Sequence, residues 1–478
     1  MSQFVCVQVG QCGNQIGSAF WPLVLHEYGI ETTSGGVNQL KIQKDYEKNV
    51  DDLSEAFNSF FHVAETSRKF SFSKLSDLTA DGSVKARAIL IDMEDSVVSR
   101  YRHGHLKNLF DETCTVTNYP GSGNNWAEGY YSHGRAYEKK IMETLRRNAE
   151  RCDSLHGFLL MHSLGGGTGS GLGTATLKLL VDEYPHVERF VSCVYPAQNQ
   201  DVVTAPYNVL LATRELIEYA TCVFPADNGA LFDICRWQER GRDNQDQARY
   251  NNTASPFQDI NSVIVNMLLH LTSGARFPGH LNADMNDLAT NLVPYPHLHY
   301  IFSSISPISM TASTIPLAQS NKNIDELFTN VWSRSHQLIK FDPLQPKAMI
   351  IGAAHIARGN CSMDDMRRNI KRFQTKVKFT PWSKETMKIG LCSVPPAAHP
   401  ASLLCLINSS AMRFMFQSLI TQFDKLYKKR AHVHHYLQVN GFEEENFLTS
   451  REFLSSVYDK YKQLDNEKQI NIPRLKVL

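Results

Sequence analysis

Short apolar segments that end in polar or glycine-rich turns recur through the first 200 residues, and they strongly limit the possible folds. The segments are Phe4–Val9, Arg87–Asp92, Gly157–His162 and Phe190–Tyr195. A continuous apolar run of this length is typical of a strand covered on both faces. Helix-forming sequence lies between them, for example "AFWPLVLHEY" after the first. We therefore predict an α/β fold with a parallel sheet flanked by helices.

Three glycine-rich loops follow predicted strands, each on the carboxyl side. They are "GQCGNQIG" (10–17), "GSGNNW" (121–126) and "GGGTGSG" (165–171). In an open α/β sheet, ligands bind at the edge where the carboxyl ends of the strands meet. We therefore expect the three loops to line one ligand site.

The third loop has the features of a phosphate cradle. Glycines let the backbone approach a ligand closely, and the helix predicted to start at Leu172 adds partial positive charge. The hydroxyl groups of Thr168 and Ser170 can donate hydrogen bonds. The alternative is a flexible linker, which the position between a buried strand and a helix disfavours.

The sequence lacks the two commonest phosphate motifs. No Gly-Lys pair occurs, which excludes a Walker A lysine, and the glycine spacing does not match the G-x-G-x-x-G dinucleotide fingerprint. Backbone N–H groups and a metal ion would then have to balance the phosphate charge. Asp92 and Glu94 are candidate ligands for Mg²⁺. Their alternative role is that of solvated surface acids.

The composition of the chain limits which partners it is expected to bind and in which cellular compartment it is expected to act. The net charge of +1 disfavours nucleic acid as a partner. The N-terminus shows no basic region ahead of an apolar run, and no apolar run suits a bilayer span, so we expect no membrane association. None of the ten cysteines forms a C-x-x-C pair, and we expect reduced thiols in the cytoplasm.

Six segments together resemble the tubulin family, in the family's order and over nearly the whole chain. They are "GQCGNQIG", "GSGNNWA", "HSLGGGTGSGLGT", "PYN" (206–208), "ARFPGHLNADMNDLATNLVPYPHLHY" (275–300) and "LYKKRAHVHHYL" (426–437). The stretches "SEAFNSFF", "KARAILIDME", "LCSVPP" and "AHVHHYLQVNGFEEENF" look most like the epsilon subfamily, with the delta subfamily second.

The resemblance implies a tubulin-like architecture. It divides the chain into a nucleotide-binding domain at 1–256 with insertions at 31–86 and 236–256, a core helix at 257–279, a mixed α/β intermediate domain at 280–408 and a C-terminal helical domain at 409–478. Its cofactors would be GTP or GDP with Mg²⁺. Its partners would be other tubulins (delta or α/β) and centriolar proteins, in the cytoplasm and cytoskeleton at the centrosome, centriole and basal body.

The resemblance also assigns the nucleotide site residue by residue. Gln11 and Cys12 would lie at the phosphates and the base side of the nucleotide, Gly123 and Asn124 would contact the terminal phosphate, and the diphosphate would be held by Ser163, Gly167, Thr168 and Gly169. Asp201 would lie at the ribose, Asn228 and Asn261 would hydrogen-bond the guanine, and Phe257 would stack on it. Glu94 would serve the magnesium, with Asp92 nearby. One position departs from the family. Ala205 stands where the family usually has an acid beside the ribose.

Catalysis would require a second subunit. In tubulins, the segment after the core helix reaches the nucleotide of the neighbouring subunit, and here it contains Asp284 and Asp287. Three residues apart on a predicted helix, they would share one face, with Asp287 polarising water and Asp284 supporting it. The alternative is two solvated acids on an exposed helix. Three functions stay open: an assembly-coupled GTPase, a structural subunit without turnover, and a dinucleotide-dependent enzyme.

Overall fold

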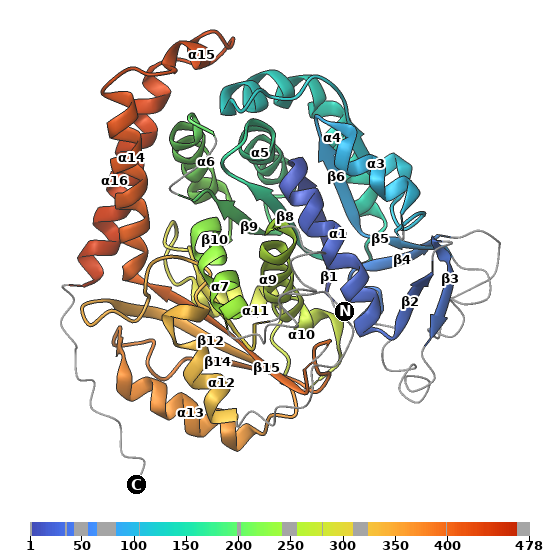
Figure 1. Ribbon diagram of the computed structural model, residues 1–478, viewed down its shortest axis with the longest axis vertical. Coiled ribbons are helices and arrows are strands. Elements are labelled where there is room, and N and C mark those ends of the chain that lie inside the picture. Colours follow the sequence, from blue (N-terminus) through green and yellow to red (C-terminus); the bar gives the residue numbers. More distant parts are fainter. Residues whose placement is uncertain are drawn as a thin grey trace.

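The computed structural model in Figure 1 describes most of the chain. The described residues are 2–33, 36–42, 56–64, 83–104, 106–197, 202–240, 256–279, 281–308, 324–397 and 399–465. Within these residues, no helix is both long and apolar enough to cross a membrane.

A six-stranded sheet forms the first half of the molecule, and all its strands are parallel. The spatial order is β10 (Cys222–Asp227), β9 (Glu188–Tyr195), β8 (Leu155–Ser163), β1 (Gln3–Val9), β6 (Ala88–Asp92) and β7 (Thr115–Thr117). Three of the four apolar segments lie within β1, β8 and β9, which extend one or two residues beyond them, and the fourth contains β6, which begins one residue after Arg87. The prediction of a parallel sheet is confirmed.

Both faces of this sheet are covered because the side chains of each strand alternate between two cores. Phe4 and Cys6 pack with α1 (Gly10–Glu27), α3 (Asp95–His103) and α9 (Pro256–Leu271). Val5, Val7 and Val9 pack on the other face with α4 (Gly134–Glu150), α5 (Gly173–Glu183) and α6 (Ala205–Tyr219). Two-sided burial explains why the strands read as continuous apolar runs.

A smaller mixed sheet forms the second part. Its order is β11 (Phe302–Ser306), β15 (Ala401–Ser409), β12 (Met349–Gly359) and β13 (Lys378–Phe379), with β14 (Lys388–Cys392) also pairing with β12. The helices α12 (Ile324–Val331) and α13 (Met363–Lys376) cover one face through Phe328 and Phe373. The short helix α11 (Met285–Leu292) packs against β12 on the way into this sheet.

The helix α9 lies between the two sheets, because its residues share one core with β1, β12 and β15. The expected single helix over 257–279 is interrupted. α9 ends at Leu271, and a separate turn, α10 (Ser273–Arg276), follows. The turn packs tightly, since a Cβ at Gly274 would lie 2.1 Å from the Ala283 carbonyl oxygen. The turn carries Arg276 back toward α1.

A buried ion triad joins these parts. Glu27, the last residue of α1, accepts from Arg276 Nη1 at 2.6 Å and from Arg358 Nη1 at 2.8 Å. Arg358 belongs to β12, and all three side chains are buried. Burial would raise the pKa of Glu27, but the charges of both arginines hold it below its ordinary value.

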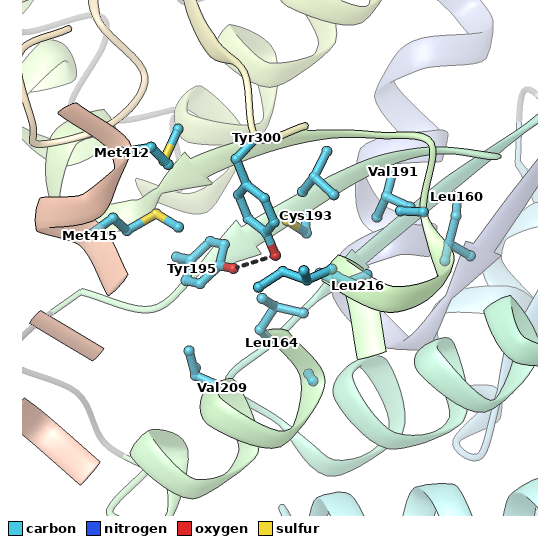
Figure 2. Close-up of a cluster of buried hydrophobic side chains, with 14 of the residues drawn as sticks. Leu160, Leu164, Val191, Cys193, Tyr195, Val209, Leu216, Tyr300, Met412 and Met415 are labelled. Carbon is cyan, nitrogen blue, oxygen red and sulfur yellow. Dashed lines mark hydrogen bonds between the residues drawn. The ribbon is translucent and has the colours of Figure 1, made fainter. Parts of the chain in front are cut away.

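Two long helices form the C-terminal part, which Figure 1 shows side by side at one edge of the molecule. They are α14 (Arg413–Tyr427) and α16 (Glu445–Leu464), with α15 (Val433–Leu437) between them. Ser409 accepts from Ala411 N and so caps the 3-10 turn that leads into α14, whereas α14 itself begins without a side-chain cap. In Figure 2, Met412 and Met415 pack near Tyr195 and Tyr300, whose hydroxyl groups are 3.3 Å apart.

The insertions differ in part from their predictions. The stretch "DLSEAFNSFF" (52–61) predicts an amphipathic helix, but of its described residues only Ala56 and Phe57 are helical, and Phe61 begins strand β4. The described backbone forms two antiparallel pairs, β2 (Ile30–Thr33) with β3 (Gly36–Ile42) and β4 (Phe61–Ala64) with β5 (Ser83–Ala86). The expected loop at 236–256 is helical over its first five residues, which end α7 (Asn228–Arg240). Residues 241–255 lie outside the described part.

Short helical turns complete the described elements. They are η3 (Glu112–Cys114), η4 (Glu128–His133), η5 (Thr168–Leu172), η6 (Arg334–His336) and η7 (Ser410–Met412).

A candidate nucleotide-binding site

The three glycine-rich loops meet at the carboxyl edge of the parallel sheet. The first runs directly from β1 into α1. Gly10 has a φ of +73°, and a Cβ there would lie 3.1 Å from the backbone nitrogen of Gly169 in the third loop. Cys12 is half-buried, with a hydrogen bond to Ser163, and burial raises its pKa to about 12. The first and third loops therefore pack against each other, as their positions after neighbouring strands predicted.

The second loop is held in place by one buried amide. Gly123 and Asn124 have φ values of +53° and +55°, so the chain turns sharply there. Asn208 Nδ2 donates to Asn124 O at 2.8 Å and to Gly165 O at 2.9 Å, so it joins the second loop to the third. Its Oδ1 accepts from Trp126 N and from the Tyr436 hydroxyl.

Asn208 was missed as a site residue by sequence reasoning. The signal was present, because Asn208 ends the quoted "PYN" segment. Its partners lie 43 and 84 residues away, which a local pattern does not reveal.

The third loop is an ordered, tightly packed turn, so the flexible-linker alternative is wrong. His162 Nδ1 lies 2.7 Å from Gly169 O. Burial lowers the pKa of His162 to about 4, which makes the neutral ring a donor to that carbonyl. A Cβ at Gly171 would lie 2.2 Å from Trp126 O. The helical backbone starts at Thr168 as the π-helical turn η5, four residues before the expected Leu172, so the helix begins inside the loop.

The third loop also contacts the second through side chains. The hydroxyl groups of Ser122 and Thr168 are 3.0 Å apart. Ser163 ends β8, and Gly167 and Gly169 pack against backbone of the second loop and of Ser163. The predicted phosphate residues Gln11, Cys12, Gly123, Asn124, Ser163, Gly167, Thr168 and Gly169 thus gather at one edge of the sheet.

Asp92 and Glu94 lie beside this cluster and suit a cation. Asp92 ends β6 and is 1% exposed, so it is not a solvated surface acid. Its Oδ2 is buried without a hydrogen-bond partner in the described chain, and burial raises its pKa to about 7. Glu94 Oε2 accepts from Gln11 Nε2 at 2.5 Å. A buried carboxylate oxygen without a donor fits a cation ligand.

Within the described residues, no group of three or more His, Cys, Asp or Glu side chains is arranged to hold a metal ion. Mg²⁺ is commonly bound by one or two carboxylates together with substrate phosphates, so the two acids match that kind of site.

The residues expected at the base begin two helices. Asn228 is the first residue of α7, while Phe257 and Asn261 lie in the first turns of α9. Phe257 is 58% exposed, and its ring centroid lies 6.2 Å from that of Phe232 in α7. Its open face is free to stack within the described structure. The start of α7 is thus held near the start of α9.

The ribose side is less fully described. Asp201 lies outside the described residues. Ala205 is buried at the start of α6 and lines a cavity of about 310 Å³ together with Asp227 and Lys340. Its methyl group cannot hydrogen-bond a sugar hydroxyl.

Asp284 and Asp287 lie away from the loop cluster. Asp284 Oδ2 accepts from the Ser2 hydroxyl at 3.0 Å, just before β1. Asn286 Nδ2 donates to His156 O near the start of β8. α11 therefore lies at the amino ends of these strands, and the cradle lies at their carboxyl ends. The seven residues of β1 separate the two by roughly 20 Å.

The expectation that both acids lie on the helix is wrong for Asp284, which precedes α11. Asp284 is the N-cap of α11 with extended backbone, and its Oδ1 accepts from Asp287 N at 2.8 Å. Capping pulls the side chain back toward the helix end. Asp287 stands in the first turn, 50% exposed, and its Oδ2 is 3.2 Å from Lys388 Nζ. Asp287 is thus paired rather than simply solvated, and sequence reasoning did not predict Lys388 as its partner.

An open hollow of about 620 Å³ adjoins the phosphate loops. Residues 121–125 of the second loop line it, together with His432, His435 and Tyr436. Asn125 Nδ2 donates to His435 O at 3.0 Å and so joins these two groups of lining residues. The terminal-phosphate end of the candidate site therefore opens to the outside of the molecule.

Comparisons with known proteins agree with this arrangement. A family model described as "Tubulin/FtsZ family, GTPase domain" matches residues 3–236, and one described as "Tubulin C-terminal domain" matches residues 296–421. The chain is 42% identical to the tubulin epsilon chains of Mus musculus and Homo sapiens, over 100% of each chain. It is 33% identical to the tubulin alpha-1 chain of Saccharomyces cerevisiae, over 96% of this chain and 97% of the relative.

Proposed function

Because the chain belongs to the tubulin family and is close to epsilon-tubulin, we propose that it is a GTP-binding cytoskeletal subunit. The observation that carries the proposal is the meeting of three glycine-rich loops at one sheet edge, tied together by Asn208. Backbone N–H groups would hold the phosphates there. Asn228 and Asn261 would read the guanine, and Phe257 would stack on it. Membership in this family removes the dinucleotide-dependent enzyme as a candidate.

The proposal includes Mg²⁺ and a division into domains. Asp92 and Glu94 would hold the ion, which when bound offsets phosphate charge. The proposed units remain 1–256, 257–279, 280–408 and 409–478. The epsilon-like sequence supports a role in centriole and basal body structure and in microtubule organisation. The proposed partners are other tubulins, delta or α/β, and centriolar proteins, at the centrosome, centriole and basal body in the cytoplasm.

The nucleotide content of the purified protein tests binding. We expect denaturation to release about one guanine nucleotide per chain, identified by chromatography, because the cradle and base residues of one chain form one site. Prior incubation with a Mg²⁺ chelator should lower the retained amount, since Asp92 and Glu94 would then leave phosphate charge unbalanced. Recovery of an adenine dinucleotide, or of no nucleotide, would contradict the proposal. The ratio of GTP to GDP reports whether turnover has occurred.

Hydrolysis is proposed to occur between subunits. Asp287 lies about one strand length from the cradle of its own chain and cannot reach it, whereas the hollow beside the second loop is open to a neighbour. Asp287 of one subunit would accept a proton from the water that attacks the γ-phosphorus of GTP on the next. An O–P bond forms as the bond to the β,γ-bridging oxygen breaks, giving GDP and phosphate. Asp284 would support Asp287 by capping α11.

We expect Asp287→Asn to reduce GTP turnover at least tenfold without changing nucleotide content, because loss of a general base typically costs 10²–10⁴-fold. Turnover per chain of the unaltered protein should rise with protein concentration, since two chains build the site. Asp233→Asn on α7 is a matched control, because it removes an acid from the nucleotide-binding part. If Asp287→Asn retains full turnover, hydrolysis through this acid is wrong.

The second candidate is a structural subunit that holds GTP without hydrolysing it. One feature of the sequence favours it: the acid at position 287 is an aspartate, one methylene shorter than the glutamate that the resemblance implies for this position in α-tubulin. A released nucleotide that is almost entirely GTP, with turnover independent of protein concentration, would support this candidate.

A further inference from the structure

Lys388 faces the acid that the proposed function assigns to catalysis. Its Nζ lies 3.2 Å from Asp287 Oδ2, and the side chains of lysine and acid are 26% and 50% exposed. Lys388 begins β14, which pairs with β12 beneath α11. Two elements far apart in sequence thus place a cation beside the only acidic residue in the first turn of α11.

The surface around this pair is suited to contact with another protein. Leu281, Tyr295 and Trp382 are among the exposed large hydrophobic residues of the described chain. Tyr295 and Trp382 lie with their ring centroids 5.9 Å apart, and Leu281 O accepts from Leu391 N of β14. Leu281 and Tyr295 thus lie just before and just after α11 in the chain, and exposed apolar side chains of this kind suit a protein interface.

The net charge near Asp287 determines how strongly the phosphates of a nucleotide repel this surface. Asp284 and Asp287 carry two negative charges, and Lys388 leaves a local net charge of −1. Without the lysine, the local charge is −2. A triphosphate is strongly negative, so an acid brought to it works against Coulomb repulsion. Asp287 must approach the γ-phosphate to act on water, and the positive charge of Lys388 reduces the repulsion between them.

We propose that Lys388 is a positioning residue that holds Asp287 and balances its charge, so that α11 can dock on the GTP phosphates of a second copy of this chain. The inference rests on the proposed function. The docking copy would present α11, and the other copy would present the open hollow beside residues 121–125. Lys388 orients Asp287 Oδ2 and leaves Oδ1, which has no hydrogen-bond partner in the described chain, to face the neighbour.

The test measures self-association of the full chain by sedimentation velocity, loaded with the GTP analogue that carries an NH bridge between the β- and γ-phosphorus. We expect Lys388→Gln to raise the half-association concentration about tenfold, in line with electrostatic steering effects. Lys388→Arg should restore association. The difference should shrink in high salt, because the Debye length falls from about 30 Å at 0.01 M to about 3 Å at 1 M.

A double variant separates charge balance from a structural role. Asp287→Asn combined with Lys388→Gln returns the local net charge to −1, so association should recover to near the unaltered value. A structural role for the lysine would leave the double variant as weak as the single one. Lys384→Gln is the matched control, because Lys384 is exposed in the same segment and has no acidic partner within 4 Å in the described chain.

Three outcomes would overturn the inference: Lys388→Gln behaving like Lys384→Gln, no recovery in the double variant, or an unaltered protein that stays monomeric at every concentration. Failure of the proposed hydrolysis is seen separately, as full turnover in Asp287→Asn. The thermal unfolding midpoint of Lys388→Gln should be unchanged, because ion pairs this exposed contribute little to stability.

Discussion

Glu27→Ala is expected to lower the free energy of unfolding by about 3–5 kcal/mol, because it leaves two buried guanidinium groups without their counter-charge. Arg276 and Arg358 are both fully buried and both bond to this one carboxylate. Their remaining partners include the carbonyl of Leu269, at the end of α9, which satisfies N–H groups without balancing charge. The loss should affect both sheets, since the triad joins α1, α10 and β12.

Denaturant unfolding of the nucleotide-loaded chain, followed by circular dichroism, measures this effect. Glu27→Gln should be less damaging, because the amide oxygen can still accept one bond. Glu143→Ala is the control, since Glu143 pairs with Arg146 and Arg147 on the exposed surface of α4, where ion pairs add little. A change below about 1 kcal/mol for Glu27→Ala would mean that water or a rearrangement hydrogen-bonds the two guanidinium groups, and that the ion triad does not hold these elements together.

Gly166→Ala is expected to weaken guanine nucleotide binding about tenfold to a hundredfold while the protein stays folded. The nearest protein atom to an added Cβ is Asn124 Oδ1 at 3.6 Å, an ordinary contact distance. Room for the methyl group therefore exists between the second and third loops, where the terminal phosphates are proposed to bind. Overpacking costs about 1–3 kcal/mol, and each 1.36 kcal/mol is a factor of ten.

Nucleotide retained after gel filtration, and titration of the emptied protein, measure this loss. Gly134→Ala is the matched control, because its added methyl group meets the Ala175 methyl inside the helical layer. Gly167→Ala differs in kind, since its Cβ would lie 2.7 Å from Asn125 N and would disturb the backbone. Wild-type retention by Gly166→Ala would show that the phosphates do not approach this glycine.

The parallel sheet and its three loops could be predicted because their signals are local. An apolar run such as Phe190–Tyr195 reports two-sided burial within a few residues, and a glycine-rich turn after it reports a close backbone approach. Asp92 and Glu94 were recognised on the same basis, since Asp92 ends β6 and Glu94 lies two residues later.

The features that escaped prediction depend on distant partners. Glu27 and Arg358 are 331 residues apart. Taken by itself in the sequence, each would be expected to be a charged residue on the surface. The three-residue spacing to Asp287 predicts that Asp284 lies within the helix, but its backbone is extended and it is the N-cap of α11. Lys388 meets Asp287 only because β14 pairs with β12 beneath α11. Long-range pairing of this kind is set by the fold as a whole, and residue order does not display it.

The opposite placement of the phosphate loops and α11 along β1 has a consequence for symmetry. A two-fold contact pairs a surface with itself, so it would set cradle against cradle or acid against acid. A contact that joins cradle to acid is heterologous, and repeating it gives a directional row. One end of such a row exposes a nucleotide, and the other exposes Asp287 with its lysine. The polarity of the row is thus set by the direction in which β1 runs.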